Sequence, residues 1–188
     1  DIAANDLIKK RLKQVSDFPI MTEESIIEYE VRKNWSTFWL VDPLDGTKDF
    51  IAKNGEFTVN IALIKDNKPI LGVIYVPNTK DIYWAYLNSG AFKNNQIIYN
   101  NSKREKLIAC DSIFHSTKEM QNFFKLHDII DVKKYGSTIK ICKLAEGEID
   151  VYPRLNGTKE LDTAAAHIIA NEAGCKLIDI VTHKELVY

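Results

Sequence analysis

Two carboxylates three positions apart follow a short apolar stretch, 38–41, in the segment Asp42-Pro-Leu-Asp-Gly-Thr47. Pro43 holds the residue before it in extended geometry, whereas Gly46 permits a sharp turn and Thr47 is a suitable residue to open a helix. Hard divalent cations prefer oxygen ligands, and phosphate oxygens bind the free backbone amides at the start of a helix. This loop could therefore supply both halves of a metal-assisted phosphate site, although the same residues are also common in turns.

Further acidic residues stand at the ends of expected elements. Glu23 and Glu24 follow a short apolar strand at 18–22, where adjacent carboxylates more often mark a solvated surface. Asp162 lies near the start of a helix at 159–172, where an aspartate is often a helix cap. Glu23 and Asp162 are candidate oxygen ligands by type and position, and the surface and capping interpretations stay open.

An alternation of strands and helices must bring these acids together. We expect helices at 1–16, 117–127, 137–145 and 159–172, and a short helical turn at 47–50. We expect strands at 18–22, 38–41, 57–65, 70–76, 81–86, 107–110, 132–135, 149–152 and 176–180, with one small strand between turns at 89–90 and 94–95. The earlier strands predict an antiparallel meander with helices packed on one side.

The most polar stretch of the chain, 100–106, is the expected domain boundary. Before it, the pattern predicts a metal-binding α+β domain built on an antiparallel sheet, at 1–104. After it, strands alternate with helices, which predicts a smaller α/β substrate-binding domain at 105–188. The expected fold class is therefore mixed α/β.

The composition argues against several classes of protein. Hydrophobic residues make up 45% of the chain and charged residues 27%, and the net charge is −1, so neither nucleic acid nor a membrane surface is expected as a partner. No apolar run approaches the ~20 residues that a membrane span requires. Cys110, Cys142 and Cys175 form no C-x-x-C pair, which favours buried thiols in a reducing cytoplasm over a zinc or redox motif.

Three segments together resemble motifs of the inositol monophosphatase family of magnesium-dependent, lithium-sensitive phosphatases. They are Thr22-Glu-Glu-Ser25, Asp42-Pro-Leu-Asp-Gly-Thr47 and Leu161-Asp-Thr-Ala-Ala165. The resemblance covers essentially the whole chain and implies a layered α/β/α/β fold, as in sugar phosphatases. In the family, the helix that resembles the one opening with Asp1 follows another helix. We therefore expect residues before Asp1, and leave open whether others follow Tyr188.

The resemblance implies how the acids divide between two metal ions. Glu23, Asp42 and the backbone carbonyl of Leu44 would hold one ion, and Asp42, Asp45 and Asp162 would hold the second, with Asp42 bridging. Oxygen ligands without histidine or cysteine favour Mg²⁺, or Mn²⁺ in its place, over zinc. Without cations, two carboxylates ~4 Å apart would repel by about 1 kcal/mol in water and about 4 kcal/mol in a half-buried cleft. A third metal site stays open.

The resemblance also implies the reaction, which is in-line attack of a metal-activated water on a phosphate monoester without a covalent enzyme intermediate. Thr47, paired with Asp1, would orient and deprotonate the water, and the amides of Gly46 and Thr47 would hold the phosphoryl oxygens. The chain departs from the family pattern at Leu161, where tryptophan is usual, and at Ala166, where glycine is usual. Because the ligand beside Leu161 is retained, we expect altered packing rather than lost activity.

Further segments resemble the bacterial 3′(2′),5′-bisphosphate nucleotidase branch of the family. They are 39–50, 55–63, Ala145-Glu-Gly147 and Tyr152-Pro-Arg154. The branch implies an enzyme of sulfur metabolism that converts adenosine 3′,5′-bisphosphate to AMP and phosphate. It also implies a cytoplasmic location, either free or at the inner face of the membrane.

Four residues are candidates for contacting the second phosphate of such a substrate: His115, Ser137, Lys140 and Arg154. Each of them taken alone is better explained as a surface residue, a loop residue or a helix cap, and only the group resembles the branch in residue type and order. By resemblance, the substrate site is completed by Glu23, Leu44, Asp45, Gly46, Thr47 and Asp162.

Two other functions stay open on the sequence. The chain could be an inositol or sugar-phosphate phosphatase of the same family, or a catalytically weak module that binds a phosphonucleotide and metal. A haloacid-dehalogenase phosphatase and a calcium EF-hand are disfavoured, because the spacing of Asp42 and Asp45 around Leu44 fits neither motif. Monomer and homodimer are both compatible with the resemblance.

Overall fold

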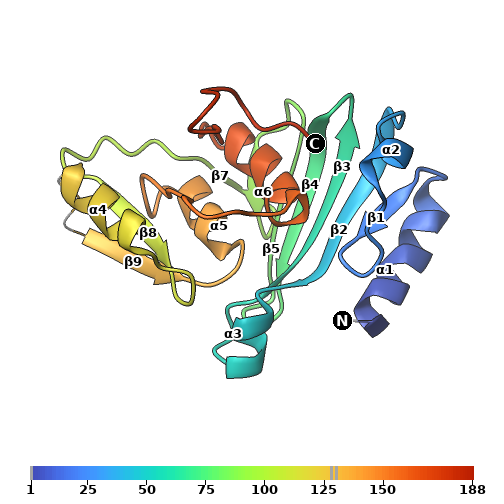
Figure 1. Cartoon of the computed structure of the whole chain (residues 1–188), viewed down its shortest axis with the longest axis horizontal. Coiled ribbons are helices and arrows are strands. Elements are labelled where there is room, and N and C mark those ends of the chain that lie inside the picture. Colours follow the sequence, from blue (N-terminus) through green and yellow to red (C-terminus); the bar gives the residue numbers. More distant parts are fainter. Residues whose placement is uncertain (1, 128, 130) are drawn as a thin grey trace.

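A seven-stranded sheet forms the centre of the computed structural model, which describes residues 2–127, 129 and 131–188 (Figure 1). Its strands lie side by side in chain order: β1 (Ile20–Thr22), β2 (Thr37–Asp45), β3 (Thr58–Lys65), β4 (Lys68–Val76), β5 (Asp81–Tyr86), β6 (Ala91–Lys93) and β7 (Gln96–Ile98). Strand β1 pairs parallel to β2, and each later neighbour pairs antiparallel. The predicted mixed α/β class with an antiparallel meander is confirmed.

The described helices are α1 (Ile2–Val15), α2 (Tyr29–Arg32), α3 (Thr47–Ala52), α4 (Lys118–Leu126), α5 (Ile139–Ala145) and α6 (Glu160–Glu172). Helix α2 is a single turn inside the segment that joins β1 to β2. None of the helices in the described ranges is long and apolar enough to cross a membrane.

Helices cover both faces of the large sheet, whereas the sequence predicted helices on one side only. Along β2, Phe38 and Leu40 belong to a core shared with α5 and α6. Trp39 and Val41 point to the opposite face, where they pack with Leu12 of α1. The prediction was wrong because a strand with apolar residues on both faces needs a cover on each of them.

Close packing of α6 against β4 depends on a glycine in the strand. A Cβ atom added at Gly72 would lie 2.3 Å from the backbone oxygen of Ala165 and 2.6 Å from Cγ2 of Ile168. Leu161 and Ala166, the two departures from the family pattern, are both buried in this helix. The contact at Gly72 therefore sets how near α6 can approach the sheet.

A second sheet contains two parallel strands, β8 (Ile108–Ser112) and β9 (Asp131–Tyr135), and shares a small core with α4. The strand predicted at 149–152 is reduced to one bridge between Ala109 and Val151. The side chain of the neighbouring Asp150 accepts a hydrogen bond from the backbone amide of Ile108 (2.8 Å) and forms an ion pair with Arg104 (2.8 Å). These side-chain contacts replace a longer ladder.

The strand predicted at 176–180 is likewise reduced to one bridge, between Ile178 and Glu185. The carboxylate of Asp179 accepts hydrogen bonds from the backbone amides of Val181 (2.9 Å) and Thr182 (2.7 Å). An aspartate that binds its own backbone two and three residues ahead favours a turn over an extended strand.

The main core draws on both halves of the chain. Buried residues of α5 and α6 pack with buried residues of β2 to β6 in one cluster. At the expected boundary, the side chain of Asn100 donates to the backbone oxygens of Leu144 (2.8 Å) and Ile149 (3.2 Å). The division into domains at 1–104 and 105–188 stays a prediction.

Candidate active site

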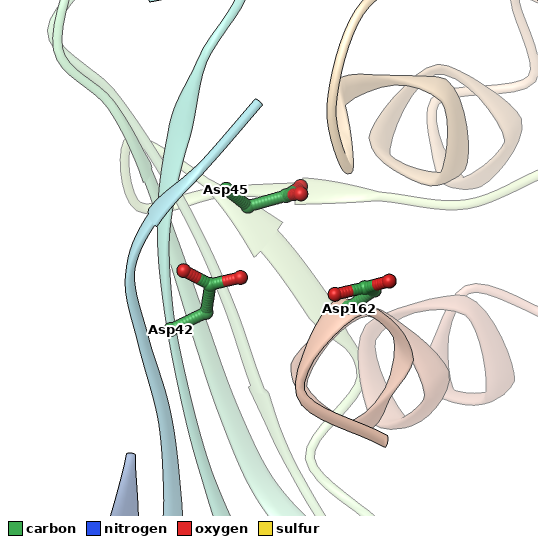
Figure 2. Close-up of side chains that lie close together, drawn as sticks. All are labelled: Asp42, Asp45 and Asp162. Carbon is green, nitrogen blue, oxygen red and sulfur yellow. The ribbon is translucent and has the colours of Figure 1, made fainter. Parts of the chain in front are cut away.

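Three aspartates meet where β2 ends and α6 begins (Figure 2). One carboxylate oxygen from each of Asp42, Asp45 and Asp162 lies within 4.8 Å of the others. Asp42 is buried, with 2% of its surface exposed, and the other two are half-buried. The structure thus brings together residues 120 positions apart that the sequence marked as candidate ligands.

The end of β2 presents Asp42 and Asp45 to the same space. Asp42 pairs with Asn60 and Asp45 with Thr58, so the two residues between the aspartates form a bulge opposite a single residue of β3. The amide of Leu44 donates to Oδ1 of Asp42 (3.0 Å), which closes the turn around the intervening proline. A bulge of this kind redirects side chains that would otherwise alternate between the two faces.

Asp45 is held by the residues that precede α5. Its Oδ2 accepts hydrogen bonds from the amide of Thr138 (2.8 Å), the Thr138 hydroxyl (2.5 Å) and the Ser137 hydroxyl. The Thr58 hydroxyl is 3.5 Å from the same oxygen. Because these contacts converge on Oδ2, they fix the position of the carboxylate.

Asp162 combines two roles that the sequence could not separate. It is the third residue of α6, and its Oδ2 accepts from the amide of Lys159 (3.0 Å) and the hydroxyl of Thr158 (3.0 Å). Asp162 therefore caps the helix, while belonging to the aspartate cluster through the same carboxylate.

The cluster is electrostatically uncompensated at its centre. Burial, followed by the negative charges of Asp45 and Glu23, raises the pKa of Asp42 to about 8, although the amide of Leu44 acts in the opposite direction. Burial and the charge of Asp45 also raise the pKa of Asp162. A buried group of carboxylates that resists ionisation is suited to bind a cation.

Glu23 lies at the edge of the cluster. The parallel pairing of β1 with β2 brings it beside the end of β2, where its amide donates to the oxygen of Val41 (3.3 Å). Its carboxylate is 2.7 Å from the ammonium of Lys159. Glu23 is thus near enough to influence Asp42, and its carboxylate is engaged with a lysine.

Thr47 and Gly46 lie beyond the bulge, at the start of α3. Gly46 has a φ of 88°, and a Cβ there would lie 3.0 Å from Cβ of Ser137, so the turn packs tightly against the loop before α5. Thr47 is the first residue of the helix and is exposed. Asp1, the expected partner of Thr47, lies outside the described residues.

Among the residues expected to contact a second phosphate, His115 lies near the positive charges of Arg154 and Lys140. His115 is exposed, and burial of its ring and the positive charges of Lys48, Arg154 and Lys140 lower its pKa. Arg154 is half-buried; its Nη2 donates to the oxygen of Gly157 (3.1 Å), and its Nε is buried without a partner among the described residues.

The side chains of Lys140 and Ser137 are engaged in hydrogen bonds within the protein. Lys140 is buried, and its ammonium donates to the backbone oxygens of Ser137 (2.5 Å) and Tyr135 (3.4 Å). The hydroxyl of Ser137 contacts Asp45. Both residues therefore stabilise the loop before α5 in this structure, and their contact with substrate stays a prediction.

Sequence reasoning missed the polar residues that support the aspartates. The Thr58 hydroxyl donates to Oδ1 of Asn60 (2.8 Å), and Asn60 donates to the Thr138 hydroxyl (2.7 Å). Thr58 and Asn60 share one face of β3 with the buried residues Ala62 and Ile64. Two polar residues on a buried face were the signal that could have identified them, because buried polar groups need partners.

The donor set fits a hard divalent cation. It consists of carboxylate oxygens from three aspartates, with Glu23 near enough to act on Asp42 and Leu44 between Asp42 and Asp45 in the chain. Oxygen donors are the preferred ligands of Mg²⁺ and Mn²⁺.

A model of the inositol monophosphatase family matches residues 1–188, the full length of the chain. The chain belongs to the inositol monophosphatase family. Among similar members, the 3′(2′),5′-bisphosphate nucleotidase CysQ of Buchnera aphidicola is 42% identical over 182 residues, which cover 94% of this chain and 68% of the relative. The protein of the same name from Salmonella typhimurium is 40% identical over 185 residues, 95% of this chain and 74% of the relative.

Solved structures agree with this family assignment. The crystal structure of CysQ from Bacteroides thetaiotaomicron, described as a bacterial member of the inositol monophosphatase family, is 42% identical. It superposes with a TM-score of 0.78 over 85% of this chain and 67% of the solved chain. The family resemblance predicted from the three sequence motifs is confirmed.

Proposed function

We propose that this family member is a magnesium-dependent 3′(2′),5′-bisphosphate nucleotidase that removes the 3′-phosphate of adenosine 3′,5′-bisphosphate and yields AMP. The observation that carries this proposal is the aspartate cluster at the end of β2, in which oxygen atoms of one buried and two half-buried aspartates lie within 4.8 Å of one another. Relatives that carry the nucleotidase name, at 40% identity and above, support the choice of substrate.

Two Mg²⁺ ions would divide the acids as the family resemblance implies, with Mn²⁺ able to replace them. Glu23, Asp42 and the carbonyl of Leu44 would hold one ion, and Asp42, Asp45 and Asp162 the other. When bound, the ions supply Lewis-acid stabilisation of the phosphoryl oxygens and a nucleophile at neutral pH. A third ion is compatible with the proposal.

The chain's own groups would position the substrate. The amides of Gly46 and Thr47 would donate to phosphoryl oxygens at the start of α3, where backbone N–H groups lack helical partners. The Thr47 hydroxyl would orient the attacking water, accept its proton and pass its own proton to the carboxylate of Asp1. The hydrogen bonds from Thr138 and Ser137 would keep the carboxylate of Asp45 in position.

A second phosphate would be bound on the side of the site where α5 and β8 approach. Lys48, Arg154 and Lys140 contribute positive charge there, beside the ring of His115. Arg154 is the best placed to bind an anion, because its Nε is buried without a partner among the described residues. A charged hydrogen bond from a guanidinium is well suited to a phosphate. Lys140 and Ser137 would support this region through their hydrogen bonds in the loop before α5.

We infer that the enzyme acts in the cytoplasm, free or at the inner face of the membrane, as a monomer or homodimer. Light scattering of the purified protein would decide the assembly state.

Phosphate release from a panel of substrates tests the proposal. With Mg²⁺, adenosine 3′,5′-bisphosphate should be hydrolysed with a higher kcat/KM than inositol 1-phosphate or fructose 1,6-bisphosphate. Preference for inositol or sugar phosphate would assign the chain to another activity of the family. Binding of the nucleotide without turnover would indicate a binding module instead.

A further inference from the structure

An ion pair lies beside the aspartate cluster. Nζ of Lys159, the residue before α6, lies 2.7 Å from Oε1 of Glu23, which follows β1. The two residues are 136 positions apart in the chain. Lys159 therefore places a positive charge on one of the carboxylates assigned to a metal ion.

Lys159 also touches a second assigned ligand through its backbone. Its amide donates to Oδ2 of Asp162 (3.0 Å), so the residue contacts the acid cluster from both ends. The hydrogen bond to Glu23, and then the negative charges of Glu23, Asp162 and Asp42, raise the pKa of Lys159. The ammonium thus faces the same carboxylates that a divalent ion would face.

A neighbouring ion pair holds these two segments together independently of Lys159. Nη2 of Arg32, at the end of α2, lies 2.8 Å from Oε2 of Glu160, the first residue of α6. The Arg32 side chain is 16% exposed, so this pair is better shielded than that of Lys159, which is 58% exposed. The start of α6 is therefore fastened beside the β1–β2 segment without the lysine.

We propose that Lys159 is a built-in competitor for the divalent ion at Glu23, so that this ion binds more tightly when the ammonium moves away. This inference rests on the proposed function, because it takes Glu23 as a metal ligand. An ammonium on Oε1 of Glu23 takes up acceptor capacity of this carboxylate and repels a divalent ion that would bind it at about 2.0–2.1 Å, so the two cations oppose each other. Because the lysine side chain is exposed and flexible, it can leave without disturbing the fold.

The consequence is two cation positions of unequal affinity. The ion held by Asp42, Asp45 and Asp162 does not compete with Lys159 for a carboxylate side chain. The ion held by Glu23 and Asp42 does compete with the ammonium. Because an exposed ion pair contributes little free energy, this competition lowers the affinity for that ion by a small factor. We expect the Glu23 position to fill last as the Mg²⁺ concentration rises.

Direct counting of bound Mn²⁺ tests this inference without reference to turnover. Free Mn²⁺ is measured by electron paramagnetic resonance during titration of the whole chain, with calorimetry of Mg²⁺ binding beside it. The variant Lys159→Met removes the charge and keeps the length and the backbone amide. It should raise the weaker affinity by about threefold to fivefold and leave the tighter affinity within about twofold.

Two control variants separate competition from loosening of the site. Lys159→Arg keeps the charge, and Arg32→Met removes the neighbouring ion pair between the same segments. Both should bind the weaker ion within about twofold of the unmodified chain. The inference is overturned if Lys159→Met changes neither affinity, raises both equally, or is matched by Arg32→Met.

A further variant separates this inference from the metal assignment beneath it. Glu23→Gln should abolish the weaker site and preserve the tighter one. If it does so while Lys159→Met has no effect, the metal assignment stands and the competition is wrong. If the unmodified chain binds no divalent ion, the proposed function fails, and the inference fails with it.

Discussion

A single carboxylate, Asp42, dominates the electrostatics of the site. It lies at the centre of the acid cluster with 2% of its surface exposed, and its pKa is raised to about 8 by burial and by its acidic neighbours. In the unfolded chain, the pKa would be close to 3.8. The folded, metal-free chain therefore keeps a proton on Asp42 at pH values where the unfolded chain has lost it.

This difference predicts how the stability of the metal-free protein depends on pH. The raised pKa of Asp42 contributes stability that is fully present below about pH 4 and is lost as the pH rises through about 8. We expect the free energy of unfolding, measured with urea in the presence of a chelator, to fall between about pH 5 and about pH 8. Asp42→Asn should flatten this decline.

Metal binding should reverse the effect, because only the ionised carboxylate is a ligand. At about pH 6, saturation with Mg²⁺ should therefore release up to about one proton, detectable by calorimetry in buffers of different ionisation enthalpy. Proton release that is unchanged in Asp42→Asn would contradict the role given to this residue.

At the scale of elements, the site depends on how closely α6 approaches the sheet. Gly72 of β4 lies against the backbone of Ala165, three residues along the helix from Asp162. A backbone atom cannot move aside as a flexible side chain can. The helix that carries Asp162 is therefore positioned by a strand residue that has no contact with the acids.

Gly72→Ala should destabilise the protein by about 1–3 kcal/mol through overpacking and should weaken Mg²⁺ binding by shifting Asp162. Urea unfolding and Mn²⁺ titration would measure the two effects. Gly157→Ala is the matched control, because a Cβ there has no neighbour within 4 Å. Equal behaviour of the two variants would show that α6 is not positioned by this contact.

The sequence predicted elements well where their pattern was local. Strands β2 to β5 and helix α6 follow apolar patterns of the expected period, and they lie close to the expected ranges. The stretches 149–152 and 176–180 failed because Asp150 and Asp179 bind backbone amides through their side chains. Apolar periodicity carries no information about such contacts, which depend on where a side chain turns.

At the scale of the whole molecule, distant segments supply one site. The motifs marked Asp42, Asp45 and Asp162 as candidate ligands, and the structure places their carboxylates close together. They did not reveal the support from Thr58, Asn60 and Thr138, because those contacts join β3 to the start of α5 across 78 residues and more. The pairing of Lys159 with Glu23 was equally invisible, since an exposed lysine has no pattern of its own.

Arg154 is the residue that we expect to distinguish a bisphosphate substrate from a monophosphate. Arg154→Ala should lower kcat/KM for adenosine 3′,5′-bisphosphate. The loss should correspond to roughly 1.5–3 kcal/mol of transition-state stabilisation, the range for a lost charged hydrogen bond. Hydrolysis of a simple monophosphate should change little. Lys118→Ala, at the exposed start of α4, is a control for general loss of positive charge. An equal loss on both substrates would mean that Arg154 does not contact the second phosphate.

The central claim is that the aspartate cluster binds the metal ions that hydrolyse a nucleotide phosphate. Its most direct test is the rate of phosphate release from adenosine 3′,5′-bisphosphate, measured across Mg²⁺ concentrations for the unmodified chain, Asp42→Asn and the exposed control Asp17→Asn. Metal ions supply several kcal/mol of transition-state stabilisation, so Asp42→Asn should lose roughly a thousandfold in kcat/KM. Its circular dichroism should stay unchanged, and Asp17→Asn should behave as the unmodified chain. A near-normal rate for Asp42→Asn at low Mg²⁺ would contradict the account.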